Sequence, residues 1–241
     1  MSDIIIKNAV AGDVATITID RADAGNALTI EHLGQLSAAF RAAGASGAKL
    51  IVLRTTGTDF CRGRDPAGGK PSPTALAMRE NLVAPILDVY DAIDGTRQPI
   101  IAVVQGAALG FGCALATACD ITIASDKARF RLPEMEKNLP PTLAASAMMG
   151  RVPRKALTWL IYSMEEIDAA TALRLGILSS VVPAAELDTR VTHHVTELTT
   201  RSHEALAAMK EYMRVAPAMA PRGAADYGAS LLSSVLSSAK R

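Results

Sequence analysis

The N-terminal half of the chain alternates between short apolar runs and longer stretches in which apolar residues recur every three or four positions. The first pattern predicts buried strands, and the second predicts amphipathic helices. Residues 4–7 and 14–20 form a predicted hairpin, and Thr29 can cap the helix that follows. The other predicted elements of this half are strands at 49–54, 99–105 and 120–124 and helices at about 74–93 and from about 111. Strands that alternate with helices favour parallel crossover connections and an α/β fold.

The C-terminal half is mostly helical. After an extended segment at 129–134, we expect helices at 142–150, 153–163, 168–175, 184–200, 202–215 and 221–238, with a short strand at 177–182. The helices after this strand have no strand beside them in the sequence, so they must cover the sheet or a neighbouring subunit. We therefore divide the chain into a core at 1–182 and a helical region for oligomerisation at 183–241.

Composition and charge exclude several classes of protein. The 241 residues include 25 Lys and Arg against 24 Asp and Glu, so there is no basic field that would attract nucleic acid. No apolar run approaches the roughly 20 residues of a membrane span, and the N-terminus does not have the pattern of a signal peptide. Three cysteines without C-x-x-C spacing indicate neither a disulfide framework nor a metal site. We expect a cytoplasmic protein.

A glycine-rich segment, GAALGFGCALATACD at 106–120, stands where a predicted strand passes into a helix. Either the glycines permit close packing of helix and strand, or they let a ligand approach the N–H groups at the helix start. The spacing is not that of a dinucleotide site, because Leu115 stands where a third glycine is needed. The sequence also contains no phosphate-loop lysine motif and no G-x-S-x-G nucleophile motif. This segment alone leaves both interpretations open.

A second loop, FCRGRDP at 60–66, also follows a predicted buried strand. Ligands of open α/β sheets bind beyond the carboxyl ends of such strands. The N–H of Arg64 in this loop and the N–H of Phe111 at the helix start could point at one position. Two converging donors form an oxyanion hole, in which each donor contributes about 3 kcal/mol to transition-state stabilisation.

Taken together, the motifs of the chain resemble those of the crotonase family, the enoyl-CoA hydratases and isomerases. The resemblance spans nearly the whole sequence. The matching segments, in order, are GNAL at 25–28, FCRGRD at 60–65, GAALGFGC at 106–113, CD at 119–120, FRLPE at 130–134, AATALRLGIL at 169–178 and VVP at 181–183.

This resemblance implies an α/β crotonase-like fold, which is a spiral of ββα turns with a C-terminal helical trimerisation region. It implies a homo-trimer or a hexamer formed by a dimer of trimers. The substrate would be an acyl-CoA, with coenzyme A entering as part of the substrate and no separate cofactor. The thioester carbonyl would lie in the hole formed by the N–H groups of Arg64 and Phe111. Asn26, Ala27, Leu28 and Arg64 would line the path of coenzyme A.

The catalytic carboxylates depart from the family pattern. Hydratases of the family hold a water between two glutamates, and the second of them corresponds to Glu134. The first falls at position 114, which is Ala114 in this chain. Alanine can neither hold a water nor move a proton. A single Glu134 can still take a proton from one carbon and return it to another, as in an enoyl-CoA isomerase, and partial burial would raise its pKa toward the working pH.

Several alternatives stay open. The chain could be an enoyl-CoA hydratase (a lyase) with one carboxylate, could perform another reaction of the scaffold, or could bind acyl-CoA without turnover, because a fold does not fix a reaction. The leading hypothesis is an enoyl-CoA isomerase of fatty-acid metabolism that uses Glu134 as its single acid/base and the amides of Arg64 and Phe111 as the oxyanion hole. In this hypothesis Met78, Leu82 and Met135 wall the acyl pocket. The same three residues could equally be ordinary core residues.

Overall fold

Six strands pair into one sheet in the computed structural model, which describes residues 5–69 and 73–238. The strand order is β1-β2-β3-β4-β6-β9, with β1 and β2 antiparallel and the other neighbours parallel. The bounds are β1 Ile6–Ala11, β2 Val14–Ile19, β3 Leu50–Thr55, β4 Ile100–Val104, β6 Ile121–Ser125 and β9 Ser180–Val182. The predicted hairpin and the parallel crossover connections are confirmed.

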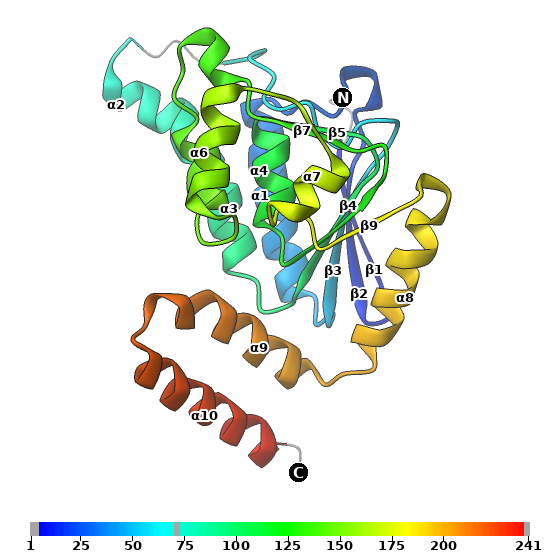
Figure 1. Ribbon diagram of the computed structural model, residues 1–241. Helices are drawn as coiled ribbons and strands as arrows, with labels where there is room; N and C mark the ends of the chain where they lie inside the picture. The colour runs from blue at the N-terminus through cyan, green and yellow to red at the C-terminus, as the bar shows by residue number, and fades with distance from the viewer. Residues whose placement is uncertain (1–4, 70–72, 239–241) are drawn as a thin grey trace.

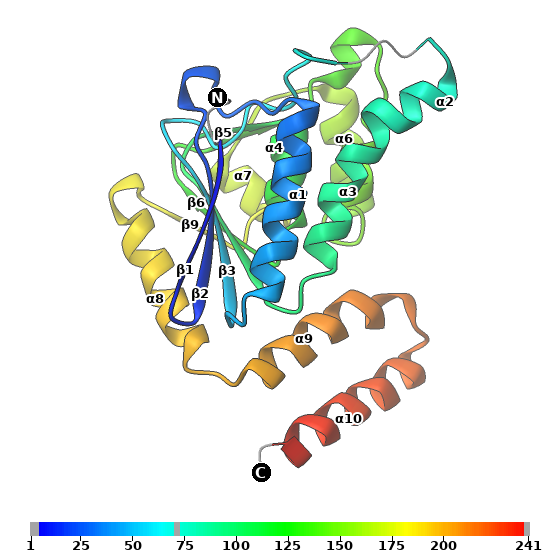
Figure 2. The same cartoon turned by 180° about the vertical axis from the view of Figure 1, so that it is seen from behind.

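Helices cover both faces of this sheet (Figures 1 and 2). Helices α1 (Ile30–Ala45), α3 (Ala84–Asp94) and α4 (Phe111–Ala118) lie on one face, and α8 (Leu187–Thr199) lies on the other. Alternate residues of β3 pack against the helices on opposite faces of the sheet. Ile51 and Leu53 belong to the main core, whereas Leu50 and Val52 pack in the cluster that contains Leu187 of α8. A strand buried on both faces has a continuous apolar sequence, as residues 50–53 do.

A smaller sheet holds two short strands that the sequence does not predict, at 107–109 and 167–168. It consists of β5 (Ala107–Leu109), β7 (Arg129–Arg131) and β8 (Ile167–Asp168) in the order β5-β7-β8. The glycine-rich segment before α4 therefore contains a short strand of its own. β5 has only three residues between two glycines, and it is extended because it pairs with β7 and, at Ala108, with Cys61.

The helix expected at 74–93 is divided by a wide turn. Its parts are α2 (Ala75–Met78), a π-helical turn η2 (Arg79–Val83) and α3. The N–H of Ala84 bonds the carbonyl of Arg79, five residues earlier. Pro85 follows directly. A proline has no N–H to donate, and its ring clashes with the carbonyl four residues before it. A local π turn accommodates both effects without ending the helix.

The remaining helices agree with the expected order. They are α5 (Thr142–Met148), α6 (Arg154–Ser163), α7 (Ala169–Arg174), α9 (His203–Val215) and α10 (Pro221–Ser238). The strand predicted at 177–182 begins only at Ser180, because Gly176 and Ile177 turn back to donate to Leu173 and Ala172 of α7. In the described ranges, no helix combines the length and the apolar character needed to cross a membrane.

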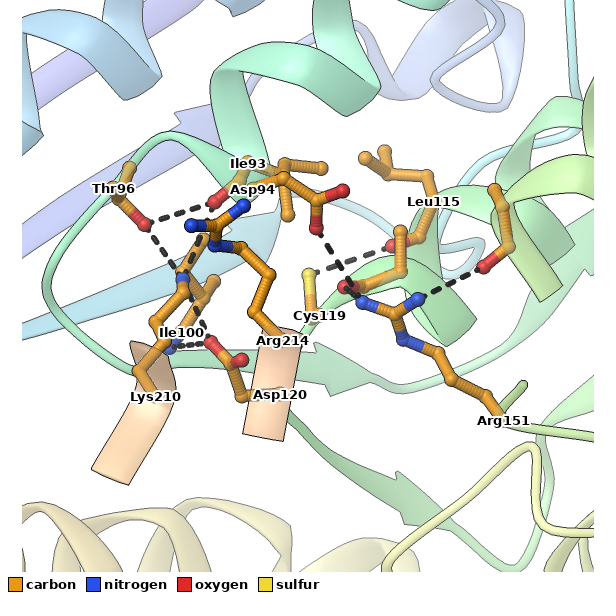
Figure 3. A network of polar contacts seen from close by, with 12 residues as sticks. Ile93, Asp94, Thr96, Ile100, Leu115, Cys119, Asp120, Arg151, Lys210 and Arg214 are labelled. Carbon is orange, nitrogen blue, oxygen red and sulfur yellow. Dashed lines mark hydrogen bonds and ion pairs between the residues drawn. The ribbon is translucent and has the colours of Figure 1, made fainter. Parts of the chain in front are cut away.

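The C-terminal helices α9 and α10 lie at one end of the body, and a buried lysine attaches α9 to it (Figures 1 and 3). The Lys210 Nζ donates to the carbonyls of Ile93 and Gln98 and to the hydroxyl of Thr96, at 3.2, 3.0 and 2.7 Å. It also pairs with the Asp120 carboxylate at 3.0 Å, which accepts the N–H of Ile100. One cation thus joins α9 to the end of α3 and to the starts of β4 and β6.

We expect Lys210→Met to lower the free energy of unfolding by about 3 kcal/mol, because it removes the cation paired with Asp120 and one donor from each of two buried carbonyls. Urea unfolding of the purified protein measures this loss. Arg222→Met is the matched control, because the Arg222–Asp226 pair is exposed, and its loss should cost less than about 0.5 kcal/mol. Equal effects of the two variants would contradict the anchoring role of Lys210.

Candidate active site

The loop at 61–65 is held between two backbone segments. On one side, Cys61 donates to Ala107 and accepts from Leu109, each at 2.9 Å. On the other side, Leu28 donates to Gly63 at 3.0 Å and accepts from Asp65 at 2.8 Å. The segment that carries Leu28 and the strand β5 thus fix the course of the loop through main-chain hydrogen bonds.

This course leaves the N–H of Arg64 free and beside the start of α4. Gly63 has φ +103°, a conformation that favours glycine, and a Cβ built on it would lie 3.1 Å from Leu109 O and 4.0 Å from Phe111 N. The N–H of Asp65 points to the Leu28 side, so that of Arg64, the residue before it, points to the opposite side. Within 5–69 and 73–238, no residue accepts the N–H of Arg64 or of Phe111.

Two glycines permit the close approach of this region to the segment at 58–61: Gly106 just before β5, and Gly112 in α4. A Cβ on Gly106 would lie 1.9 Å from Thr58 O, and one on Gly112 would lie 2.0 Å from Cys61 O. No side chain fits at such distances. The glycines therefore serve both purposes considered for them. The close packing of α4 on the loop is also what brings the N–H groups of Arg64 and Phe111 together at the start of α4. Phe111 is the first residue of α4, where the helix leaves N–H groups unpaired and the dipole is positive.

The Glu134 carboxyl lies directly beside this helix start. Gly110 has φ +53° and ψ −118°, and a Cβ on it would lie 2.8 Å from Glu134 Oε1. The Gly110 N–H donates to Arg131 of β7 at 2.8 Å, and Glu134 begins the 3₁₀ turn at Glu134–Lys137, which follows that strand closely. The pairing of β5 with β7 therefore brings the carboxyl to the residue before the Phe111 amide.

Burial raises the pKa of the Glu134 carboxyl above its ordinary value, and its own backbone N–H offsets this in part. Its Oε2 atom is buried and finds no hydrogen-bond partner in the part of the chain that the structure describes. Such a carboxyl can hold and release a proton closer to neutral pH than an exposed glutamate can. The arrangement therefore combines free amide donors with a group suited to proton transfer.

Position 114, where a hydratase of the family would have its first glutamate, is an alanine in this chain and supplies no carboxylate. Ala114 is fully buried in α4. The neighbouring carboxylate of Glu136 is exposed and forms an ion pair with Arg131. The thiols of Cys61 and Cys113 are buried, and burial raises the pKa of each to about 12, so both stay protonated and are poor nucleophiles.

Sequence reasoning did not select Tyr90 of α3, which the structure adds to this group. Its ring stacks on that of Phe111, with centroids 6.0 Å apart and an interplanar angle of 21°. The apolar face of the 84–94 helix includes this tyrosine together with Ile86, Val89 and Ile93, so its sequence pattern identifies a core position and nothing more.

The residues predicted to line the coenzyme A path lie next to the loop. Asn26 is fully buried with φ +56°, and its amide donates to the carbonyls of Thr56 and Asp59 at 2.7 and 2.8 Å. Asn26 thus fixes the turn at 56–59 that precedes the loop, and Leu28 is paired with Arg64. The Arg64 side chain is exposed. Contacts of Asn26, Ala27, Leu28 and Arg64 with coenzyme A stay a prediction.

Arg21 and Asp65 have a structural role in the same region. They form an ion pair at 2.7 Å, and Arg21 also donates to the carbonyl of Ala27 at 2.6 Å. Asp65 further accepts the N–H of Ala67, so it helps to fix the shape of its loop. Arg21 and Lys70 are also candidates for contacts with the phosphates of coenzyme A, and Lys70 lies outside the described residues.

The three residues predicted to wall the acyl pocket differ in exposure. Leu82 is half-buried and packs against the main core. Met135 is half-buried beside Glu134 in the 3₁₀ turn, whereas Met78 of α2 is 42% exposed. Their role as pocket walls stays a prediction, with Met78 the outermost of the three.

Comparison with known proteins gives consistent matches. The family described as enoyl-CoA hydratase/isomerase matches residues 9–241. A probable enoyl-CoA hydratase of Mycobacterium tuberculosis is 32% identical over 200 residues, which cover 82% of this chain and 76% of that protein. The short-chain-enoyl-CoA hydratase of Clostridium acetobutylicum is 31% identical over 179 residues, covering 73% and 68%.

Solved structures agree. An enoyl-CoA hydratase of Mycobacterium smegmatis has a TM-score of 0.91 at 26% identity, covering 97% of this chain and 91% of that one. A hydratase/isomerase (crotonase) described from Legionella pneumophila has a TM-score of 0.86 at 27% identity, covering 96% and 91%. The predicted crotonase-like α/β fold is confirmed.

We expect Gly112→Ala to destabilise the protein by about 3 kcal/mol, because its methyl group would meet the Cys61 carbonyl at 2.0 Å and push α4 from the loop. Chemical unfolding measures the change. Gly34→Ala in α1 is the matched control, since nothing lies within 4 Å of its Cβ, and it should stabilise the helix by about 1 kcal/mol. A neutral Gly112→Ala would contradict the close approach.

The raised pKa of Glu134 predicts a pH-dependent stability. In the unfolded chain the pKa of a glutamate is about 4.3. Since the folded protein disfavours the ionised form, the stability of the wild type relative to Glu134→Gln should be constant below that pH and fall as the pH rises through the higher folded pKa. Urea unfolding of both proteins between pH 4 and 8 tests this. A relative stability that increases with pH would show that the fold stabilises the carboxylate.

Proposed function

Since the chain belongs to the enoyl-CoA hydratase/isomerase family, we propose that it shifts the double bond of an enoyl-CoA thioester with Glu134 as its single acid/base. As a member of that family it is an enzyme of the hydratase or isomerase type. Which of the two reactions it performs depends on the groups beside the bound acyl chain. Those groups are the free amides of Arg64 and Phe111 and the carboxyl of Glu134.

The first step of the proposed reaction is the removal of a proton beside the thioester carbonyl. The carbonyl oxygen accepts hydrogen bonds from the N–H groups of Arg64 and Phe111. When the proton leaves, negative charge develops on that oxygen, and the two fixed donors stabilise it without reorganising. The positive end of the α4 dipole adds to the same effect.

The second step is the return of the proton at another carbon. Glu134 takes the proton from the carbon between the carbonyl and the double bond of a 3-enoyl thioester. The electron pair forms a conjugated enolate, and Glu134 then delivers the proton to the far end of that system, which gives the 2-enoyl thioester. A carboxyl with a raised pKa suits both directions of this transfer.

The observation that carries this proposal is that one half-buried carboxyl lies beside the helix start while position 114 is alanine. Hydration would need a second group to hold and activate the water. Glu136 does not fill that place, because it is exposed and paired with Arg131. A shuttle between two carbons needs only one group.

Hydration with one carboxylate is the second candidate. The names of the relatives support it, since both sequence relatives described above are named hydratases. In that reaction Glu134 would activate a water and another donor would hold it. An acyl-CoA-binding protein without turnover is the third candidate and is separated by the same assay.

Three further expectations accompany the proposal. The reaction needs no cofactor beyond the coenzyme A that the substrate carries. The chain acts as a trimer or hexamer, to which the exposed apolar residues Met209, Met213, Leu232 and Leu236 of α9 and α10 lend support. It works in the cytoplasm.

The test compares 3-enoyl-CoA and 2-enoyl-CoA of equal chain length as substrates of the purified protein. We expect conversion of the 3-enoyl ester to the conjugated 2-enoyl ester, followed by its absorbance, and a loss of kcat of about 10²–10⁴-fold in Glu134→Gln. Glu136→Gln is the matched control, because it changes the same group two residues away on the exposed side of the turn, and it should keep its activity.

Each other result identifies another candidate. Hydration of the 2-enoyl ester without isomerisation would replace the isomerase by the hydratase. Binding of both esters without conversion would favour the non-catalytic protein. Equal losses in Glu134→Gln and Glu136→Gln would show that Glu134 is not the acid/base.

A further inference from the structure

Tyr90 brings a buried hydroxyl group close to the start of α4 and to the carboxyl of Glu134. The tyrosine is 8% exposed, and its ring stacks on that of Phe111, whose N–H is one of the two free amides. Its oxygen is buried and has no hydrogen-bond partner among residues 5–69 and 73–238. A buried hydroxyl without a partner destabilises a protein, so its presence beside a functional site requires an explanation.

The groups around this hydroxyl make it a donor. Burial raises the pKa of Tyr90, and the nearby Cys113, Glu134 and Cys61 raise it further, so the phenol keeps its proton at neutral pH. Neither thiol accepts a hydrogen bond from it, and Glu134 Oε2 is itself buried and unpaired. A donor and a carboxyl oxygen therefore lie near the start of α4 without bonding each other.

A ligand that fills this site decides whether the hydroxyl is satisfied. Phe111 and Ala114 are three residues apart in α4 and share one face of the helix, and the alanine offers no polar atom to Tyr90. A purely hydrocarbon acyl chain would cover the hydroxyl and leave it unpaired. An acyl chain with an oxygen at the right carbon would accept its hydrogen bond. Sites with a buried donor discriminate strongly against ligands that lack the acceptor.

We propose that Tyr90 is a specificity-determining residue whose hydroxyl donates a hydrogen bond to an oxygen on the acyl chain. The preferred ligand is accordingly an acyl-CoA that carries a hydroxyl or oxo group, in place of a plain hydrocarbon acyl-CoA. This inference rests on the proposed function for the location of the acyl site at α4, and it does not depend on which reaction follows.

The test measures binding by calorimetry in the Glu134→Gln protein, so that no proton transfer interferes. The probes are butanoyl-CoA, 3-hydroxybutanoyl-CoA and 4-hydroxybutanoyl-CoA, which differ in one oxygen. We expect at least one hydroxy ester to bind about tenfold more tightly than butanoyl-CoA, and Glu134→Gln/Tyr90→Phe to bind all three within about twofold. Equal binding of the three esters before the Tyr90 change, or a preference that survives it, would overturn the proposal.

A second readout separates this role from a structural one. Tyr90→Phe keeps the ring and its stacking on Phe111 and removes only the unpaired hydroxyl. Its Tm without ligand should equal or exceed that of the wild type, while selectivity for the hydroxy ester is lost. A lower Tm would show that the hydroxyl is already satisfied in the free protein, and this would overturn the proposal.

The outcomes also separate this inference from the proposed isomerisation. A protein that selects the hydroxy ester through Tyr90 but does not isomerise 3-enoyl-CoA would refute only the reaction. A protein that isomerises but binds all three esters equally would refute only the role of Tyr90. Failure to bind any of the esters would refute both.

Discussion

The candidate site depends on two places where one backbone carbonyl occupies the position that a Cβ would need. Gly106 lies against Thr58, and Gly112 lies against Cys61, with less than the room of a methyl group at either point. The contact of Gly112 brings the first turn of α4 to the loop at 61–65, and that of Gly106 brings the start of β5 to Thr58. The amide donors of the site follow from that approach of α4, because it leaves the amides of Arg64 and Phe111 free at a common edge.

The electrostatics of the site depend on the pairing of β5 with β7. The strand β5 ends at the helix start, and its neighbour β7 leads into the turn that carries Glu134. The carboxyl is thus buried beside Gly110, which raises its pKa, and it has no second carboxylate at position 114. At the far end of β4 and β6, Lys210 attaches the C-terminal helices to the same strands that carry the site (Figure 3). Proton transfer by one group, in place of activation of a water between two, is the chemistry that this arrangement favours.

Much of this arrangement could be predicted from the sequence, and the exceptions have physical reasons. Apolar runs bounded by turns predicted every strand of the large sheet, and the motifs predicted the fold and the carboxyl of Glu134. The strand β5 escaped prediction because three residues between glycines have no periodicity, and only pairing with β7 and Cys61 extends them. Tyr90 escaped because its pattern is that of a core residue, and its unpaired hydroxyl appears only in three dimensions. The π turn before α3 depends on Pro85 in a helix that tertiary packing maintains.

The central claim is that one buried carboxyl carries a proton between two carbons of an enoyl thioester. The most direct measurement uses a 3-enoyl-CoA with deuterium on the carbon between the thioester and the double bond. Mass spectrometry and NMR then locate the deuterium in the product. The account predicts that part of the deuterium reappears at the fourth carbon of a 2-enoyl product, since the buried Glu134 returns the same proton that it removed. A product with only solvent hydrogen at that carbon, or a hydrated product, would contradict it.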